Sequence, residues 1–268
     1  MNGFEAVLYG FIQGTTEYLP VSSSAHLILL PKFLGNEDPG LAFDVFLHLG
    51  TLFATLIYFW KDWVALLRPD HWRRNLAKRD GISIATLVVA TIPAVLAGLL
   101  LQHWADTIFR GEGVVVVTLT IGALLLYFSD RFAKSTRSLE GARFRDALLV
   151  GLFQCLALVP GMSRSGSTMA GARLAGFSRA SAAHFSFLMS APITAGAILF
   201  EMKKAGAELF TAGTIPMSSF VIAFFSTFIF GMLSIGFLLR FLKKVGFLSF
   251  AIYRVALSLL VYFVFRPF

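Results

Sequence analysis

Long apolar stretches dominate this sequence, and they restrict it to the folds that a lipid bilayer allows. Six stretches are long enough and apolar enough to cross a membrane as helices: 43–60, 83–102, 113–132, 184–201, 217–241 and 247–266. A transmembrane helix needs about 20 mostly apolar residues, whereas a membrane β-barrel uses segments of about ten residues that alternate in polarity. Charged residues make up only 14% of the 268 positions, against about 25% in a soluble domain. The sequence therefore predicts an all-α, polytopic membrane protein.

Two further apolar regions are too short to cross the membrane without a break, and a proline interrupts each of them. Residues 4–34 are divided at Pro20, and residues 147–177 are divided at Pro160. Proline ends a helix because it lacks the N–H group and its ring clashes with the preceding turn. Irregular backbone at membrane depth is tolerated only where it lines a cavity within the protein. We interpret each region as a re-entrant helix pair that enters the membrane and returns to the same side.

The two halves of the chain share one order of features, which indicates an internal duplication. Gln13 precedes Phe46 by 33 residues, and Gln154 precedes Phe187 by 33 residues. In each half, a re-entrant pair is followed by three predicted spans. The chain then divides into three parts within one integrated domain: a first repeat at 1–132, a linker at 133–146 and a second repeat at 147–268.

The number of membrane crossings determines how the two repeats are related. Because a re-entrant pair adds no crossing, each repeat crosses three times, so the second repeat must be inverted relative to the first. Three connections on one face then contain six, five and three Lys or Arg residues: 61–80, 131–146 and 240–246. The positive-inside rule assigns this face and the linker to the cytoplasm, so the net charge of +8 is a topology signal and not a nucleic-acid footprint. Both termini lie outside, and the two re-entrant tips are expected to meet near the midplane.

The first tip carries polar side chains that a membrane helix does not normally contain. Gln13 and Glu17 are four residues apart and share a helix face, and their oxygens are of the kind that Mg²⁺ or Ca²⁺ prefers. Ser22, Ser23 and Ser24 follow, and His26 is close behind them. A serine beside a histidine can be a nucleophile with its base, whereas a serine before a helix can also be only an N-cap. Because polar groups at this depth are costly, we expect a functional site.

The second tip has the composition of an anion-binding loop. Arg164 lies between Ser163 and Ser165, with Thr168 one turn later. The planar guanidinium group matches phosphate oxygens, and hydroxyl and backbone N–H groups complete such a site. Together the two tips predict phosphoryl transfer, in which positioning and charge neutralisation provide most of the catalysis.

These two tips resemble the signatures of a known family. The segments Gln13-x-x-x-Glu17 and Pro20-Val-Ser-Ser-Ser-Ala-His26 are similar to the first signature of the undecaprenyl-diphosphate phosphatase (bacitracin-resistance) family. The segment Pro160-Gly-Met-Ser-Arg-Ser-Gly-Ser-Thr168 is similar to its second signature, PGxSRSxxT, and the resemblance covers essentially the whole chain. It implies a metal-dependent enzyme of the bacterial inner membrane, with its active site open to the outer face. Its substrate would be the C55 isoprenoid diphosphate, which it converts to the monophosphate so that the carrier lipid returns to cell-wall synthesis.

The resemblance also assigns roles to single residues. Glu17 matches the closing carboxylate of the first signature, whereas Gln13 stands where many members have Glu, which removes one charged metal ligand. Ser23 and His26 match the proposed nucleophile and its acid/base partner, and Arg164 matches the phosphate-binding arginine. Residue types leave open whether Ser23 is phosphorylated or whether Glu17 or His26 activates water. Five further residues are expected to bind phosphate: Ser22, Ser24, Ser163, Ser165 and Thr168.

Some alternatives and roles stay open at this stage. A secondary transporter or flippase of a lipid-linked phosphate would also show inverted repeats and broken helices. The acid-phosphatase class of lipid phosphatases does not fit, because it needs a histidine where Ala170 stands. A homodimer is compatible with the sequence. Four residues have no assigned partner or role: Asp44, His48, Arg173 and Arg254.

Overall fold

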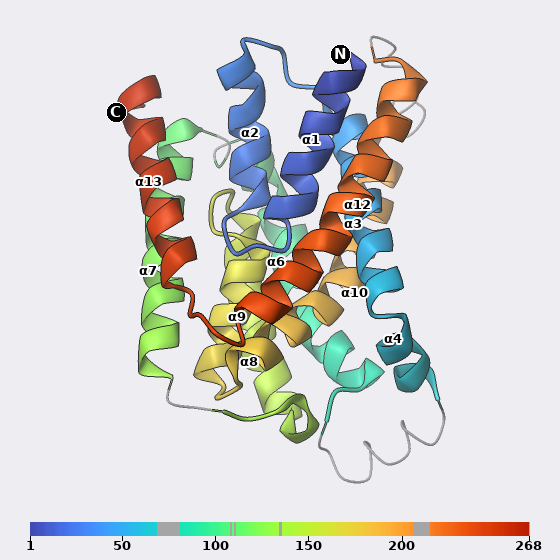
Figure 1. Ribbon diagram of the computed structural model, residues 1–268, viewed down its shortest axis with the longest axis vertical. Helices are drawn as coiled ribbons and strands as arrows, with labels where there is room; N and C mark the ends of the chain where they lie inside the picture. Colours follow the sequence, from blue (N-terminus) through green and yellow to red (C-terminus); the bar gives the residue numbers. More distant parts are fainter. Residues whose placement is uncertain (69–80, 108, 110, 134–135, 206–214, 268) are drawn as a thin grey trace.

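The protein is an all-helical bundle in the computed structural model (Figure 1). The structure describes residues 1–68, 81–107, 109, 111–133, 136–205 and 215–267. Within these ranges it contains eleven α-helices and two short 3₁₀ turns, η1 (Leu139–Gly141) and η2 (Leu156–Leu158), and no strand. The predicted all-α class is therefore confirmed. Residues 69–80 of the basic connection 61–80 lie outside the described residues.

Helices occupy all six stretches that the sequence predicts as spans: α3 (Leu41–Tyr58), α6 (Ile84–Thr107), α7 (Glu112–Phe132), α10 (Arg179–Ala205), α12 (Met217–Phe241) and α13 (Leu248–Phe265). All of them except α3 are individually long and apolar enough to cross a membrane. Helix α3 passes the same test together with α4 (Trp60–Leu67), to which it is joined by a bend of 70°. Large apolar side chains such as Leu100 and Phe263 are exposed on the outside of the bundle. The chain is thus a multi-pass membrane protein.

Four shorter helices lie at the two ends of the bundle: α1 (Gly3–Thr16), α2 (Ser23–Leu34), α8 (Phe144–Cys155) and α9 (Arg164–Leu174). Helices α1 and α2 occupy one end and α8 and α9 the other, and the loops that join each pair reach the middle of the bundle (Figure 1). Glu17 to Ser22 form the first of these loops, and Val159 to Ser163 form the second. The prolines at 20 and 160 lie within these loops, where the sequence predicts the helices to end.

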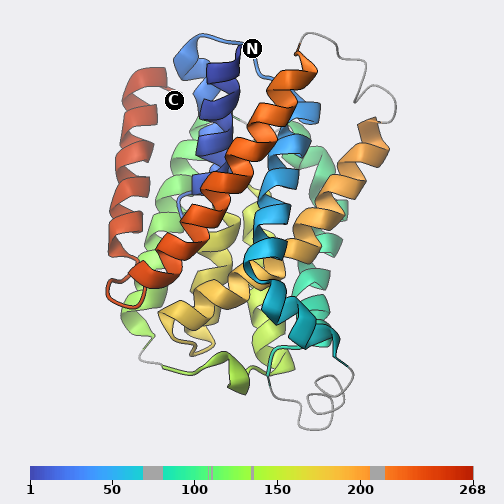
Figure 2. The same ribbon diagram turned by 45° about the vertical axis from the view of Figure 1, so that its right-hand side comes forward.

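Two close helix contacts hold the short helices inside the bundle. Helix α1 packs along α12, and α8 packs along α6; Figure 2 shows α12 crossing the bundle in front of α1 and α3. A Cβ atom at Gly10 would lie 2.5 Å from Cβ of Ser226, and one at Gly151 would lie 2.5 Å from the carbonyl oxygen of Ala90. Only glycine allows this approach, as is usual where membrane helices pack closely. These contacts fix the depth at which the two loops lie.

Candidate active site

The two loops have the same local geometry where each leads into its second helix. The N-cap residues, Ser22 and Ser163, both have positive φ angles, 75° and 69°. Each serine hydroxyl accepts a hydrogen bond from the backbone N–H three residues later (3.4 and 3.1 Å). Each also lies 3.2 Å from the hydroxyl oxygen two residues later. A positive φ is uncommon for serine and is typical of constrained functional loops. Ser22 and Ser163 are therefore capping residues that shape the two tips.

The two loops contact each other directly, although they are far apart in the sequence. Arg164 donates from Nη2 to Oε1 of Glu17 at 2.7 Å, which forms a largely buried ion pair between them. The Ser165 hydroxyl donates to the Leu19 carbonyl at 3.2 Å, and the N–H of Gly161 donates to Oγ of a serine in the first tip at 3.4 Å. The structure thus brings together the carboxylate and the guanidinium that the sequence places in one site.

The Glu17 carboxylate is the centre of a compact polar cluster. Its Oε2 atom accepts a hydrogen bond from Oγ of Ser23 at 2.5 Å and from Nε2 of Gln13 at 3.2 Å. Its Oε1 atom accepts from Arg164, whose Nη1 also donates to the carbonyl of Ser186 at 3.2 Å. Charge-assisted bonds of this kind are stronger than those between neutral groups. The cluster therefore places a hydroxyl, its proton acceptor and a cation within one hydrogen-bonded unit.

Two adjoining cavities lead to this cluster. A cavity of about 240 Å³ is lined by Glu17, Ser23, Ser24 and Arg164, with apolar residues of α6 and α10 on its other walls. A second cavity, of about 160 Å³, is also lined by Ser23 and Ser24, and it extends to Asp38. Because the two cavities share residues, they lie next to each other. Together they connect the loop after α2 with the buried ion pair.

His26 is held away from the predicted nucleophile. Its Nδ1 atom lies 2.7 Å from the carbonyl oxygen of Ser22, and its Nε2 atom lies 2.7 Å from the hydroxyl of Tyr253, on which the ring is stacked. Ser23 instead donates to Glu17. In the described part of the chain, no hydrogen bond joins His26 to Ser23, and His26 lines neither cavity. A catalytic role for His26 stays a prediction.

The residues predicted to bind phosphate fall into two groups. Ser24 and Ser163 line the larger cavity. Ser22, Ser165 and Thr168 do not line it. Their hydroxyls make hydrogen bonds within the protein, such as the 2.7 Å contact between Thr168 and the hydroxyl of Ser186. These three residues shape the loops around the cavity.

Comparisons with known proteins show the family of this chain. A sequence model described as bacitracin resistance protein BacA matches residues 6–260. The chain belongs to this family. It is 46% identical to the undecaprenyl-diphosphatase of Desulforudis audaxviator over 261 residues, 97% of each chain. It is 41% identical to the undecaprenyl-diphosphatase of Moorella thermoacetica, covering 99% of this chain and 98% of that one. It is 43% identical to that of Gemmatimonas aurantiaca, covering 98% and 97%.

His48, whose role the sequence left open, lies at the candidate site of this BacA-family protein. It lies on α3 and lines both cavities together with Ser23 and Ser24. Its Nδ1 atom is 2.8 Å from the carbonyl oxygen of Asp44, one turn earlier, so the proton is expected on Nδ1 and the lone pair on Nε2. Nε2 could then accept a proton or a hydrogen bond from a ligand. The sequence signal was the i,i+4 pair of Asp44 and His48 within an apolar helix.

Arg254 of this BacA-family protein joins both loops from within the bundle. It lies on α13 with no exposed surface. Its guanidinium group donates to the Pro20 carbonyl of the first loop at 3.4 Å and to the Gly161 carbonyl of the second loop at 2.7 Å. It also donates to Met162 and to two carbonyls of α7. Arg254 therefore fixes the positions of the loops from behind the site.

Arg173 does not reach the site. Its Nε atom donates to Oδ1 of Asp130 at 3.0 Å, and its two terminal nitrogens donate to the carbonyls of Ala133 and Phe177. It thus ties the end of α9 to α7. Arg173, to which the sequence assigned no role, therefore has a structural one at the end of its helix.

The end of α1 and the start of the first loop offer oxygen atoms that fit a divalent cation. Because Nε2 of Gln13 donates to Glu17, Oε1 of Gln13 is left as a buried oxygen with no hydrogen-bond partner in the described part of the chain. Mg²⁺ commonly binds through one or two protein oxygens and the substrate's phosphates. No group of three or more His, Cys, Asp or Glu side chains suited to a metal exists among the described residues. Gln13 and Glu17 therefore fit an ion that is held mainly by a diphosphate.

Proposed function

We propose that this protein hydrolyses undecaprenyl diphosphate to the monophosphate and inorganic phosphate, and so recycles the lipid carrier of cell-wall synthesis. The observation that carries the proposal is the cluster of Glu17, Ser23 and Arg164 at the meeting of the two loops. The names of the relatives support it, since each is an undecaprenyl-diphosphatase. The three residues come from one chain, so the site needs no second subunit, although a homodimer is compatible with it.

We further propose that the two loops belong to re-entrant pairs of inverted repeats. Helices α1 and α2 enter the bundle from one end and α8 and α9 from the other, which supports the inversion (Figure 1). Gln13 and Gln154 occupy corresponding positions, and both leave Oε1 buried without a hydrogen-bond partner within the described residues. In the inner membrane, this arrangement puts the termini and Asp38 on the outer face. Because the smaller cavity extends to Asp38, substrate would enter from outside.

Cysteine labelling tests this topology. The background variant is Cys155→Ala, which removes the chain's one cysteine. We expect Asn36→Cys, in the exposed loop after α2, to react with a membrane-impermeant maleimide on intact cells or spheroplasts. Lys244→Cys, also exposed and at the other end of the bundle, should react only after permeabilisation. Labelling of both cysteines from the same side would contradict the inverted topology.

In the proposed reaction, the terminal phosphate takes a position beside Arg164 and the isoprenoid tail lies among the apolar helices. Oγ of Ser23 attacks the terminal phosphorus and passes its proton to Oε2 of Glu17, which is 2.5 Å away in the structure. The bridging P–O bond breaks, and the lipid monophosphate leaves with the proton that Glu17 received, so Glu17 is again a carboxylate. Water then attacks the phosphoserine. Glu17 takes the proton from water and returns it to Oγ of Ser23 as the bond between Oγ and phosphorus breaks, and inorganic phosphate is released.

Two groups would stabilise the charge that develops in this reaction. Arg164 binds oxygens of the transferred phosphate. A divalent cation, Mg²⁺ or Ca²⁺, held by Glu17 and Gln13 would neutralise the diphosphate oxygens. His48 lines the same cavities, and its Nε2 atom could accept a proton or a hydrogen bond from the ligand.

Phosphate release from undecaprenyl diphosphate by detergent-purified protein tests the proposed function. We expect EDTA to lower the rate at least ~100-fold and added Mg²⁺ or Ca²⁺ to restore it, because the diphosphate charge would no longer be neutralised. Glu17→Gln, which keeps the shape but loses the charge, should lower the rate by ~10³-fold in the presence of metal. Glu140→Gln, the same change at an exposed position, should have no effect.

A transporter or flippase remains the second candidate, because its fold would be the same. If the folded protein releases no phosphate under any metal condition, the hydrolase proposal fails. Transfer of a fluorescent isoprenoid phosphate across vesicles would then be measured.

A further inference from the structure

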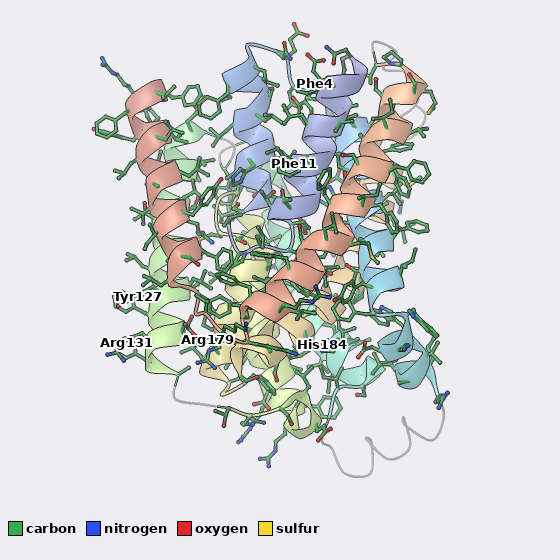
Figure 3. The ribbon with its side chains drawn as sticks, viewed as in Figure 1. Phe4, Phe11, Tyr127, Arg131, Arg179 and His184 are labelled. Atoms are coloured by element: carbon green, nitrogen blue, oxygen red, sulfur yellow. The ribbon has the colours of Figure 1, made fainter. Side chains whose placement is uncertain are left out.

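A further cavity, outside the candidate active site, lies at the opposite end of the bundle from α1 and α2. It has a volume of about 910 Å³ and is lined by residues at the ends of α7, α9, α10, α12 and α13. Figure 3 shows three of them, Tyr127, Arg131 and Arg179, close together near this end of the bundle. It shares no lining residue with the two cavities that reach Glu17 and Ser23. It is therefore a separate site.

The charge of this cavity is strongly positive. Its lining contains four cationic side chains, Arg131, Arg173, Arg179 and Lys243, and one carboxylate, Asp130, which leaves a formal surplus of three positive charges. The carboxylate is already engaged, since Oδ1 accepts from Nε of Arg173 at 3.0 Å and from Nε of Arg179 at 2.8 Å. Arg131 and Lys243, by contrast, are exposed on the rim of the cavity. The cavity is thus complementary to an anion.

The helix ends at this cavity add to its preference for phosphate. Helix α10 begins at Arg179, so its N-terminus, with its partial positive charge, is part of the lining together with Ser178. Guanidinium and ammonium groups are the usual partners of phosphate oxygens, and a helix N-terminus favours the same ligand. The chemistry therefore points to a phosphate group.

Apolar residues next to the charged ones indicate whether that phosphate belongs to a lipid or is a free ion. Leu248, at the start of α13, lines the cavity and is 53% exposed, and Val245 lines it with 42% exposed. On α7, the exposed rings of Phe128 and Phe132 stack on each other beyond Tyr127. A free phosphate ion needs no apolar surface, whereas a phospholipid buries its chains against it. We propose that this cavity binds the phosphate of an anionic lipid head group, whose acyl chains lie along α7 and α13.

This inference does not depend on the proposed phosphatase function. Under the proposed topology, the cavity lies at the level of the cytoplasmic head groups, where basic residues occur in any membrane protein because of the positive-inside rule. Such residues attract anionic lipid through their number and not their position. At a specific binding site, in contrast, the affinity depends on which residue carries the charge. Lys243 and Lys244 allow the two to be separated, since both are exposed but only Lys243 lines the cavity.

Native mass spectrometry of the purified full chain, released from micelles that contain equal amounts of phosphatidylglycerol and phosphatidylcholine, tests the site. We expect one phosphatidylglycerol to be retained in preference to phosphatidylcholine. The double variant Arg131→Gln/Lys243→Gln should weaken this retention by about 30-fold, because each cation near an anionic head group contributes roughly a fivefold change in affinity. Lys244→Gln should change it by less than about threefold.

Several outcomes would overturn the proposal. Equal retention of the two lipids, or a loss of about fivefold in Lys244→Gln, which is the effect expected for one cation at any position, would show general surface attraction. Displacement of the lipid by an equal concentration of inorganic phosphate would show a site for free phosphate. The double variant should still release phosphate from undecaprenyl diphosphate at the parent rate, which confirms that it is folded. If the parent itself is not a phosphatase, thermal unfolding reports folding and the lipid result still stands.

Discussion

Replacing Ser23 with alanine should lower the rate of phosphate release at least ~10³-fold and leave the helical bundle intact. The Ser23 hydroxyl lies 2.5 Å from the Glu17 carboxylate and lines both cavities, so it is the hydroxyl best placed to lose its proton and attack phosphorus. Loss of a nucleophile removes the covalent route and leaves only binding and charge stabilisation. The rate would be measured with saturating undecaprenyl diphosphate and Mg²⁺.

Ser24→Ala provides the matched control. Ser24 lines the same cavities, but its hydroxyl contacts Ser22 and accepts from the N–H of Gly161 at 3.4 Å. Loss of such a hydrogen bond costs about 1 kcal/mol, so less than a tenfold change is expected. Acid-quenched reactions should contain phosphoserine at position 23. A Ser23→Ala enzyme with more than a tenth of the parent activity, or the absence of phosphoserine, would favour direct attack by water activated by Glu17.

The sequence predicted the parts of this site that depend on composition and helix breaks. Charged and hydroxyl side chains beside Pro20 and Pro160 had few explanations in an apolar chain, and the structure brings Glu17 and Arg164 together at 2.7 Å. The same reasoning predicted helical, membrane-spanning segments, because the length of an apolar stretch can be counted directly from the sequence. Which member of a serine cluster caps a helix is a matter of backbone angles. Residue types alone could not separate Ser22 from Ser23, and only the family resemblance singled out Ser23.

Contacts across the bundle were not predictable in this way. One ring nitrogen of His26 contacts the carbonyl of Ser22, four residues earlier in the sequence. The other contacts the hydroxyl of Tyr253, which is 227 residues away in the sequence. Proximity in sequence favoured a pair between His26 and Ser23, whereas the fold gives the histidine another partner. His48 was harder to place because Ser23 and Ser24, which line the same cavities, come from another helix. Pairings of this kind depend on tertiary packing and leave no local pattern.

The largest effect on folding is expected at Arg254, whose partners are backbone carbonyls and so have no sequence signature. Replacement by leucine would leave the carbonyls of Pro20, Gly161 and Met162 without this donor inside the bundle. A buried polar group that loses its partner costs about 1–3 kcal/mol, and breaking a buried charged network costs 3–5 kcal/mol. We expect Arg254→Leu to lose at least ~3 kcal/mol and to lower the unfolding midpoint in detergent by at least ~6 °C.

Two further variants show whether this effect comes from joining the loops. Arg254→Lys keeps the charge but offers one compact ammonium group in place of the planar fork, so it should recover only part of the stability and little of the activity. Arg240→Leu makes the same change from arginine to leucine at an exposed position near the end of α12. It should leave the unfolding midpoint within about 1 °C of the parent value. Unchanged stability and phosphate release in Arg254→Leu would mean that the direct contacts between the loops, such as the ion pair of Glu17 and Arg164, hold them in place without Arg254. Activity lost in parallel with stability would instead show that both tips take their positions from a single buried arginine, because that side chain donates to the carbonyls of Pro20 and Gly161 together.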